Sequence, residues 1–166
     1  MADERHPLHD LFEEQIKDLY SAENQIIKAL PKIAKNASNP QLRTAFERHL
    51  EETRGQVARL EQIAEELDFN PKGKKCKGAE GLIEEGKEVM DEFEEDTLDA
   101  GLIGAAQKVE HYEIAAYGTA RAHAQLLGYT KAARLLQQTL DEEGRTDKKL
   151  SQLAESIVNV EALQEA

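Results

Sequence analysis

The chain of 166 residues carries a formal net charge of −12, and helix formers such as Ala, Leu, Glu and Lys dominate its composition. This length suits one domain with a buried core, so we expect residues 1–166 to form a single all-α domain. The acidic charge argues against nucleic acid as a partner, and no apolar run approaches the roughly 18 residues that a membrane span requires.

Apolar residues at helical spacing predict five helices, over about residues 8–36, 40–67, 79–94, 98–127 and 130–158. Pro31 lies inside the first pattern and predicts a kink or break there. Asn39 and Pro40 suit the N-cap and the first position of the second helix. Gly128 is placed to end the fourth helix, and Thr130 to cap the fifth.

An internal repeat relates the first two long helices to the last two. When the sequence is shifted by 90 residues, Leu50-Glu51-Glu52 falls on Leu140-Asp141-Glu142, and Glu23 falls on Glu113. The repeat predicts two similar helical hairpins, with the short helix on the long crossover between them. We therefore predict a ferritin-like four-helix bundle with a crossover connection.

Each long helix carries polar residues at the middle of its apolar face. The candidate metal ligands are Glu23, His49, Glu52, Glu110, Glu113, Glu143 and Asp147. Carboxylates that converge in a dry core repel one another unless some are protonated or cations compensate them. Because His49 is the one basic candidate on the inner faces, the charge balance favours metal. Oxygen ligands with one or two imidazoles suit one or two Fe or Mn ions.

One ligand position remains open between two adjacent glutamates. Helical phase places Glu143 inward, because it continues the series from Leu136 to Leu150. The internal repeat instead pairs Glu142 with Glu52. We favour Glu143. A hydrogen-bonded polar core without metal is the alternative to the whole set.

Four sequence blocks resemble the YciF-like stress proteins, a branch of the ferritin-like superfamily that also contains the rubrerythrins. These blocks are YSAENQ from Tyr20, HLEETRGQ from His49, AAQKVEHYEIAAYGT from Ala105 and TLDEEGRTDKKL from Thr139. The resemblance covers nearly the whole chain. It implies a ferritin-like bundle, a homodimer and a bacterial stress context.

The resemblance also implies a site pattern, with one Glu from each of two helices and a Glu-x-x-His from each of the other two. Glu23 and Glu113 match the single glutamates, and Glu143 matches the Glu of the second pair. The positions that depart from the pattern are Thr53, Gln56 and Thr146. His49-x-x-Glu52 is the motif reversed, and Glu110 and Asp147 could substitute from adjacent positions. A one-metal site, an unusual two-metal site and a vestigial polar core all remain open.

We expect a ferritin-like metal-binding stress protein that acts in peroxide or oxygen chemistry or in iron handling. As an enzyme it would be a di-metal carboxylate oxidoreductase with small oxygen species as substrates. The alternative is a metal-free, dimeric helical protein that acts through protein–protein interaction. Phe69, Met90 and Phe93 surround the crossover and would need cover from a second subunit. The single Cys76 and the lack of a signal peptide fit a cytoplasmic protein.

Overall fold

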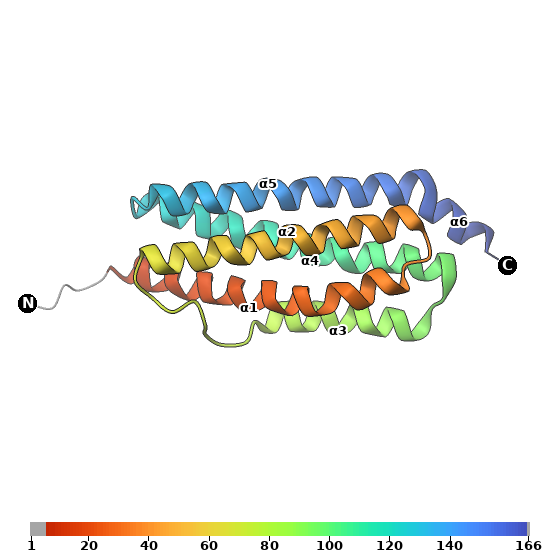
Figure 1. Cartoon of the computed structure of the whole chain (residues 1–166), viewed down its shortest axis with the longest axis horizontal. Coiled ribbons are helices and arrows are strands. Elements are labelled where there is room, and N and C mark those ends of the chain that lie inside the picture. The colour runs from red at the N-terminus through yellow and green to blue at the C-terminus, as the bar shows by residue number, and fades with distance from the viewer. Residues whose placement is uncertain (1–5, 166) are drawn as a thin grey trace, which may run out of the picture.

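Long stretches with an apolar residue every three or four positions fold as helices in the computed structural model, which describes residues 6–165 (Figure 1). The elements are α1 (Pro7–Asn36), α2 (Pro40–Glu66), α3 (Lys77–Glu92), α4 (Glu95–Leu126), α5 (Thr130–Leu153), a π-helical turn (Ala154–Val158) and α6 (Asn159–Gln164). No strand occurs among the described residues, so the all-α prediction is confirmed.

The directions of the helices explain the crossover. α1 and α2 form one antiparallel hairpin and α4 and α5 form another, but α2 and α4 run in the same direction (Figure 1). The chain must therefore return along the bundle between them, and α3 makes this return while packing on α1 and α4. Shifting α1 and α2 by 90 residues gives 97–126 and 130–156, close to the bounds of α4 and α5. The predicted four-helix bundle with a crossover helix is confirmed.

Most helix ends follow the sequence signals, with two exceptions. The side-chain oxygen of Asn39 accepts hydrogen bonds from the first turn of α2, and Gly128 adopts a φ of 76° after α4. Of the kink or break predicted at Pro31, a break is wrong, because α1 continues to Asn36, and a kink stays a prediction. Pro31 is exposed, so water can reach the carbonyl that loses its N–H partner. Thr130 is the first residue of α5 rather than its cap, which is Tyr129.

Several helix bounds differ from the sequence prediction, three of them with a clear local feature. α3 begins at residue 77 rather than 79, because the Cys76 sulfur accepts a hydrogen bond from the Ala79 N–H at 3.4 Å. α4 begins at residue 95 rather than 98, with Glu95 and Asp96 in a first turn that favours acidic side chains. α5 gives way to the π-helical turn after Leu153. Burial raises the pKa of the Cys76 thiol, which indicates a structural residue rather than a reactive one.

Two apolar clusters fill the bundle on either side of its middle. One cluster includes Ile26, Leu30, Leu42, Phe46, Leu102, Leu150 and Leu153. The other includes Phe12, Ile16, Leu19, Leu60, Ile63, Ala120 and Leu136. Apart from His9 and Asp99, the buried polar residues of the four long helices lie between these clusters along the sequence of each helix. The polar layer is therefore closed off at both ends by packed hydrocarbon, which keeps its dielectric low.

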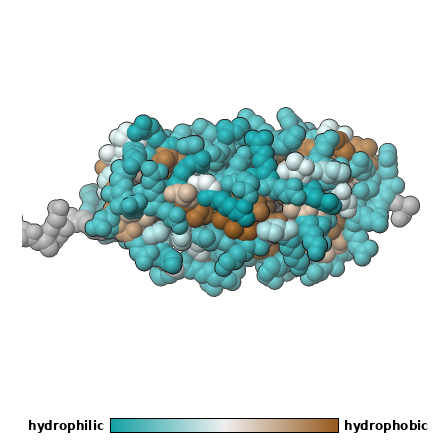
Figure 2. All heavy atoms as spheres, viewed as in Figure 1, coloured by the Kyte–Doolittle hydropathy of each residue, from teal (hydrophilic) through white to brown (hydrophobic). Residues whose placement is uncertain are grey.

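Hydrophilic residues cover most of the face shown in Figure 2, and hydrophobic residues gather near its middle and toward the C-terminal end. Ile83, Val89 and Met90 of α3 pack against the core, so α3 covers most of its own apolar side. Phe93, which follows α3, remains 44% exposed. Within residues 6–165, no helix combines the length and hydrophobicity that crossing a membrane requires.

Asp99 ties the turn between α1 and α2 to α4. It is 1% exposed, and its carboxylate accepts hydrogen bonds from the backbone N–H groups of Ser38 and Asn39 at 2.8 and 2.7 Å. Asp99→Ala should lower the free energy of unfolding by about 1–3 kcal/mol, because both donors lose their acceptor. Urea unfolding measures this loss. The exposed Asp91→Ala serves as the control and should stay within about 0.5 kcal/mol of wild type. Equal losses in the two variants would contradict this role.

Candidate metal centre

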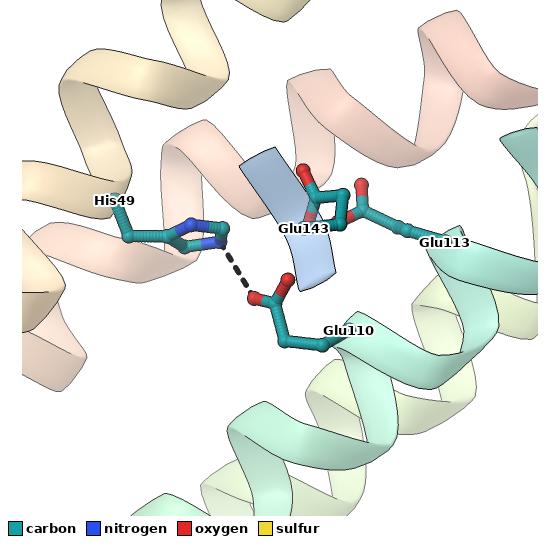
Figure 3. Close-up of side chains that lie close together, drawn as sticks. All are labelled: His49, Glu110, Glu113 and Glu143. Carbon is teal, nitrogen blue, oxygen red and sulfur yellow. Dashed lines mark ion pairs between the residues drawn. The ribbon is translucent and has the colours of Figure 1, made fainter. Parts of the chain in front are cut away.

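Four buried side chains from three helices converge at the middle of the bundle (Figure 3). They are His49 of α2, Glu110 and Glu113 of α4, and Glu143 of α5, and we call them the His–Glu cluster. Each offers one ligand atom, and these four atoms all lie within 4.8 Å of one another. The three-residue spacing of Glu110 and Glu113 places both carboxyl groups on the inner face of α4.

Figure 3 marks one ion pair within the cluster, between His49 and Glu110. The His49 Nε2 lies 3.0 Å from a carboxylate oxygen of Glu110, and the two side chains are 6% and 1% exposed. Burial lowers the pKa of His49, although the charges of Glu143 and Glu52 oppose this shift. The ring is therefore neutral at pH 7 and cannot offset the charge of the surrounding carboxylates.

The cluster glutamates lack hydrogen-bond donors. Glu113 and Glu143 are fully buried, and no amide, hydroxyl or cationic group of residues 6–165 donates to either oxygen of these two side chains. The Oε2 of Glu110 likewise receives no hydrogen bond from such a group. Burial raises the pKa of Glu110 and of Glu113 well above the ordinary glutamate value, and the neighbouring Glu143 raises both further. These carboxyl groups must hold either protons or a cation.

Glu23 of α1 borders the cluster without joining it. It is fully buried, and its Oε1 accepts a hydrogen bond from the Tyr117 hydroxyl at 2.5 Å, whereas no amide, hydroxyl or cationic group of residues 6–165 donates to its Oε2. Burial raises the pKa of Glu23 to about 8, and the charge of Glu143 contributes to this shift. Glu23 and the cluster are therefore coupled electrostatically.

Besides Glu23, two further predicted ligands lie outside the cluster. Glu52 accepts hydrogen bonds from Arg48 at 3.1 Å and from Thr146 at 3.4 Å. Asp147 accepts a hydrogen bond from Gln107 at 3.0 Å and lies 3.3 Å from the Nε2 of the exposed His111. Both carboxylates sit at the edges of their helices' inner faces, so their side chains turn to partners nearer the surface.

The two adjacent glutamates of α5 have different surroundings. Glu143 lies in the cluster, whereas Glu142 turns toward α2, where Arg59 donates to its two oxygens at 2.6 and 2.8 Å. Gln56 also donates to Glu142, at 3.1 Å. Sequence reasoning missed Arg59, because a position at the edge of the buried face of α2 does not distinguish a paired arginine from a solvated one.

The positions that depart from the Glu-x-x-His pattern make hydrogen bonds within the protein. The Thr53 hydroxyl donates to the backbone carbonyl of His49 at 2.7 Å, Gln56 donates to Glu142, and Thr146 donates to Glu52. These three side chains connect α2 and α5 or stay within α2, and none belongs to the His–Glu cluster. The cluster is therefore asymmetric with respect to the internal repeat.

The chain resembles known proteins over nearly its whole length. Residues 7–163 match the family described as "Domain of unknown function (DUF892)". The chain is 51% identical to Protein YciF of Escherichia coli (strain K12) over 157 residues, which cover 93% of this chain and 95% of that protein.

Solved structures agree with this match. The crystal structure of the E. coli stress protein YciF has a TM-score of 0.87 at 48% identity, covering 96% of this chain and 98% of that one. YcfI from Rhodopseudomonas palustris has a TM-score of 0.85 at 40% identity, covering 91% and 97%. A Xanthomonas campestris pv. campestris protein, at 22% identity and a TM-score of 0.77, shares the fold. The chain therefore belongs to the DUF892 family and is a YciF-like stress protein.

Proposed function

We propose that the His–Glu cluster binds one or two iron or manganese ions. The observation that carries this proposal is the group of buried carboxyl oxygens on Glu110, Glu113 and Glu143 to which no amide, hydroxyl or cationic group of residues 6–165 donates. The adjacent imidazole of His49 is neutral, so it supplies no compensating charge. A divalent cation would offset both the desolvation and the mutual repulsion of these groups.

The donor set supports iron or manganese over other metals. One imidazole and three carboxylates are hard, oxygen-rich ligands, whereas structural zinc sites and copper sites favour more Cys or His ligands. The free Oε2 of Glu23 could serve a second ion, with the Tyr117 hydroxyl holding the other oxygen in place. An ion with open coordination positions would supply redox and Lewis-acid chemistry toward peroxide or oxygen. The apolar clusters on both sides would exclude bulk water.

Metal analysis tests the proposal directly. Protein purified without chelators and reconstituted with Fe(II) or Mn(II) should hold about one or two ions per chain, and its melting temperature should rise with metal concentration. A hundredfold excess of metal over Kd should add about 2.7 kcal/mol to the free energy of unfolding. Fewer than about 0.1 ion per chain after both reconstitutions would overturn the proposal, because the native state would then gain no binding free energy.

A metal-free role in protein–protein interaction is the second candidate. α3 and α6 finish at the same end of the molecule (Figure 1), and the observation that favours this role is the exposure of apolar side chains in α6 and just after α3. Phe93, Val160 and Leu163 are 44%, 48% and 85% exposed. Such residues are typical of surfaces that another protein covers.

We also propose a homodimer, with Phe93 as the residue that carries the physical argument. Ile83, Val89 and Met90 of α3 already pack on the core. Fewer apolar residues around the crossover therefore need cover from a second subunit than the sequence predicted. Light scattering at tens of micromolar protein should give about twice the chain mass of 18.6 kDa. Phe93→Ser should shift the population toward monomer, whereas a wild type that is already monomeric would contradict the dimer.

A further inference from the structure

A pocket of about 540 Å³ opens between α2 and α5 on the outer side of the His–Glu cluster. Its walls include the cationic side chains of Arg48, Arg145 and Lys149, together with the carboxylate of Glu52. His49 also lines it, so one residue contributes to both the pocket and the cluster. The volume suits a small molecule rather than a peptide or a helix.

The charge of this pocket differs in sign from that of the chain. Three cationic groups face one carboxylate, whereas the whole protein has a net charge of −12. Glu52 is paired with Arg48 at 3.1 Å. Arg145 and Lys149 lie one helical turn apart on α5, and no carboxylate of residues 6–165 pairs with either of them. Two unpaired cations therefore line the pocket together, which favours an anionic ligand.

The pocket lining also includes apolar side chains. Pro40, Ala45 and Leu150 supply hydrocarbon, which lowers the local dielectric and strengthens the electrostatic contacts of a bound ion. The Nδ1 of His49 is buried and has no hydrogen-bond partner in the described chain, whereas its Nε2 contacts Glu110. The pocket lining thus combines exposed cations with a histidine that also belongs to the His–Glu cluster.

We infer that the α2–α5 pocket binds a small oxyanion of the carboxylate or phosphate type beside His49. Guanidinium and ammonium groups are the side chains that bind such anions by charge-assisted hydrogen bonds. The inference goes beyond the metal proposal and does not depend on it, because Arg145 and Lys149 face the pocket whether or not the cluster holds an ion. The same positive charge disfavours this pocket as the route by which a divalent cation reaches the cluster.

The test uses the full chain freed of metal with a chelator. Inorganic phosphate and acetate are titrated separately at constant ionic strength set with chloride, and binding is followed by the NMR shifts of the His49 ring and of the amides over residues 145–149. At least one anion should give saturable shifts. Arg145→Gln with Lys149→Gln should weaken that binding by about tenfold or more, because both unpaired cations are removed.

A matched control separates the pocket from general charge. Arg134→Gln with Lys148→Gln removes the same charge from two exposed positions of α5 that do not line the pocket, and binding should change by less than about twofold. The absence of saturable shifts with both anions would overturn the inference, and so would equal weakening in the two double variants. The anion that binds identifies the ligand class. If the first double variant is unfolded by circular dichroism, the two single variants replace it, and their binding decides in the same way.

Discussion

Replacing Glu113 and Glu143 together by leucine should abolish metal binding while leaving the metal-free protein at least as stable as wild type. Both side chains are fully buried, and no amide, hydroxyl or cationic group of residues 6–165 donates to them, so their removal orphans no donor. Buried charge replaced by well-packed hydrocarbon is often neutral, or stabilising by about 1–4 kcal/mol. Thermal melts with and without Fe(II) or Mn(II) measure both effects, and the metal-dependent rise in Tm should vanish in the variant.

Glu142→Leu is the matched control for this experiment, because it alters the residue next to Glu143 on the same helix. It removes the acceptor of both Arg59 and Gln56, so it should lower the free energy of unfolding by about 1–3 kcal/mol. Its metal-dependent rise in Tm should be retained. Loss of the metal effect in Glu142→Leu alone would place the site around Glu142 instead.

Glu23 is a poorer position for the leucine substitution than its burial suggests. It accepts a hydrogen bond from the buried Tyr117 hydroxyl, so Glu23→Leu would leave that hydroxyl unsatisfied. If the Glu113→Leu and Glu143→Leu double variant unfolds without metal, and the wild type shows no metal-dependent rise in Tm, the polar layer is a structural feature. The metal proposal would then fail.

Sequence periodicity predicted the fold because the residues that define each helix lie close together in the sequence. Apolar residues three and four positions apart define each long helix, and the 90-residue repeat relates the two hairpins. The same helical phase placed Glu110, Glu113 and Glu143 on inner faces, where the structure has them. It also distinguished Glu143 from Glu142, because a step of one residue rotates a side chain by about 100°.

Side-chain partners across helices could not be predicted in this way. Glu52 and Asp147 lie one residue from a buried stripe, and their direction depends on whether Arg48, Gln107 or another donor is within reach. The pairing of Arg59 with Glu142 and the pocket between α2 and α5 likewise require the relative placement of two helices. Periodicity within a single helix carries no such information.

The metal-free protein should lose stability as the pH rises from 6.5 to 8, and bound metal should offset this loss. Burial raises the pKa of Glu23 from the ordinary value of 4.5 to about 8, and it raises the pKa of Glu110 and of Glu113 as well. Between these values the folded state holds protons that the unfolded state has released, so the free energy of unfolding falls as pH rises. Glu23 alone accounts for roughly 3–5 kcal/mol over its full window from 4.5 to about 8.

The titration of His49 changes stability with pH in the opposite direction, and it sets the lowest pH at which the experiment is useful. Burial lowers its pKa from 6.5, so the unfolded state binds the extra proton, and at most about 0.4 kcal/mol of this contribution is gained above pH 6.5. Urea unfolding at pH 6.5 and at pH 8 therefore reports mainly on the glutamates. With chelator present, stability should be lower at pH 8. With saturating Mn(II) the carboxylates are already ionised by the cation, so the metal-dependent gain in stability should be larger at pH 8 than at pH 6.5.

The Glu113→Leu and Glu143→Leu double variant should show a smaller pH dependence of stability, because one raised pKa and the repulsion from Glu143 are gone. A chelated wild type whose stability is constant or rises over this range would show that the buried carboxyl groups do not carry the protons assigned to them.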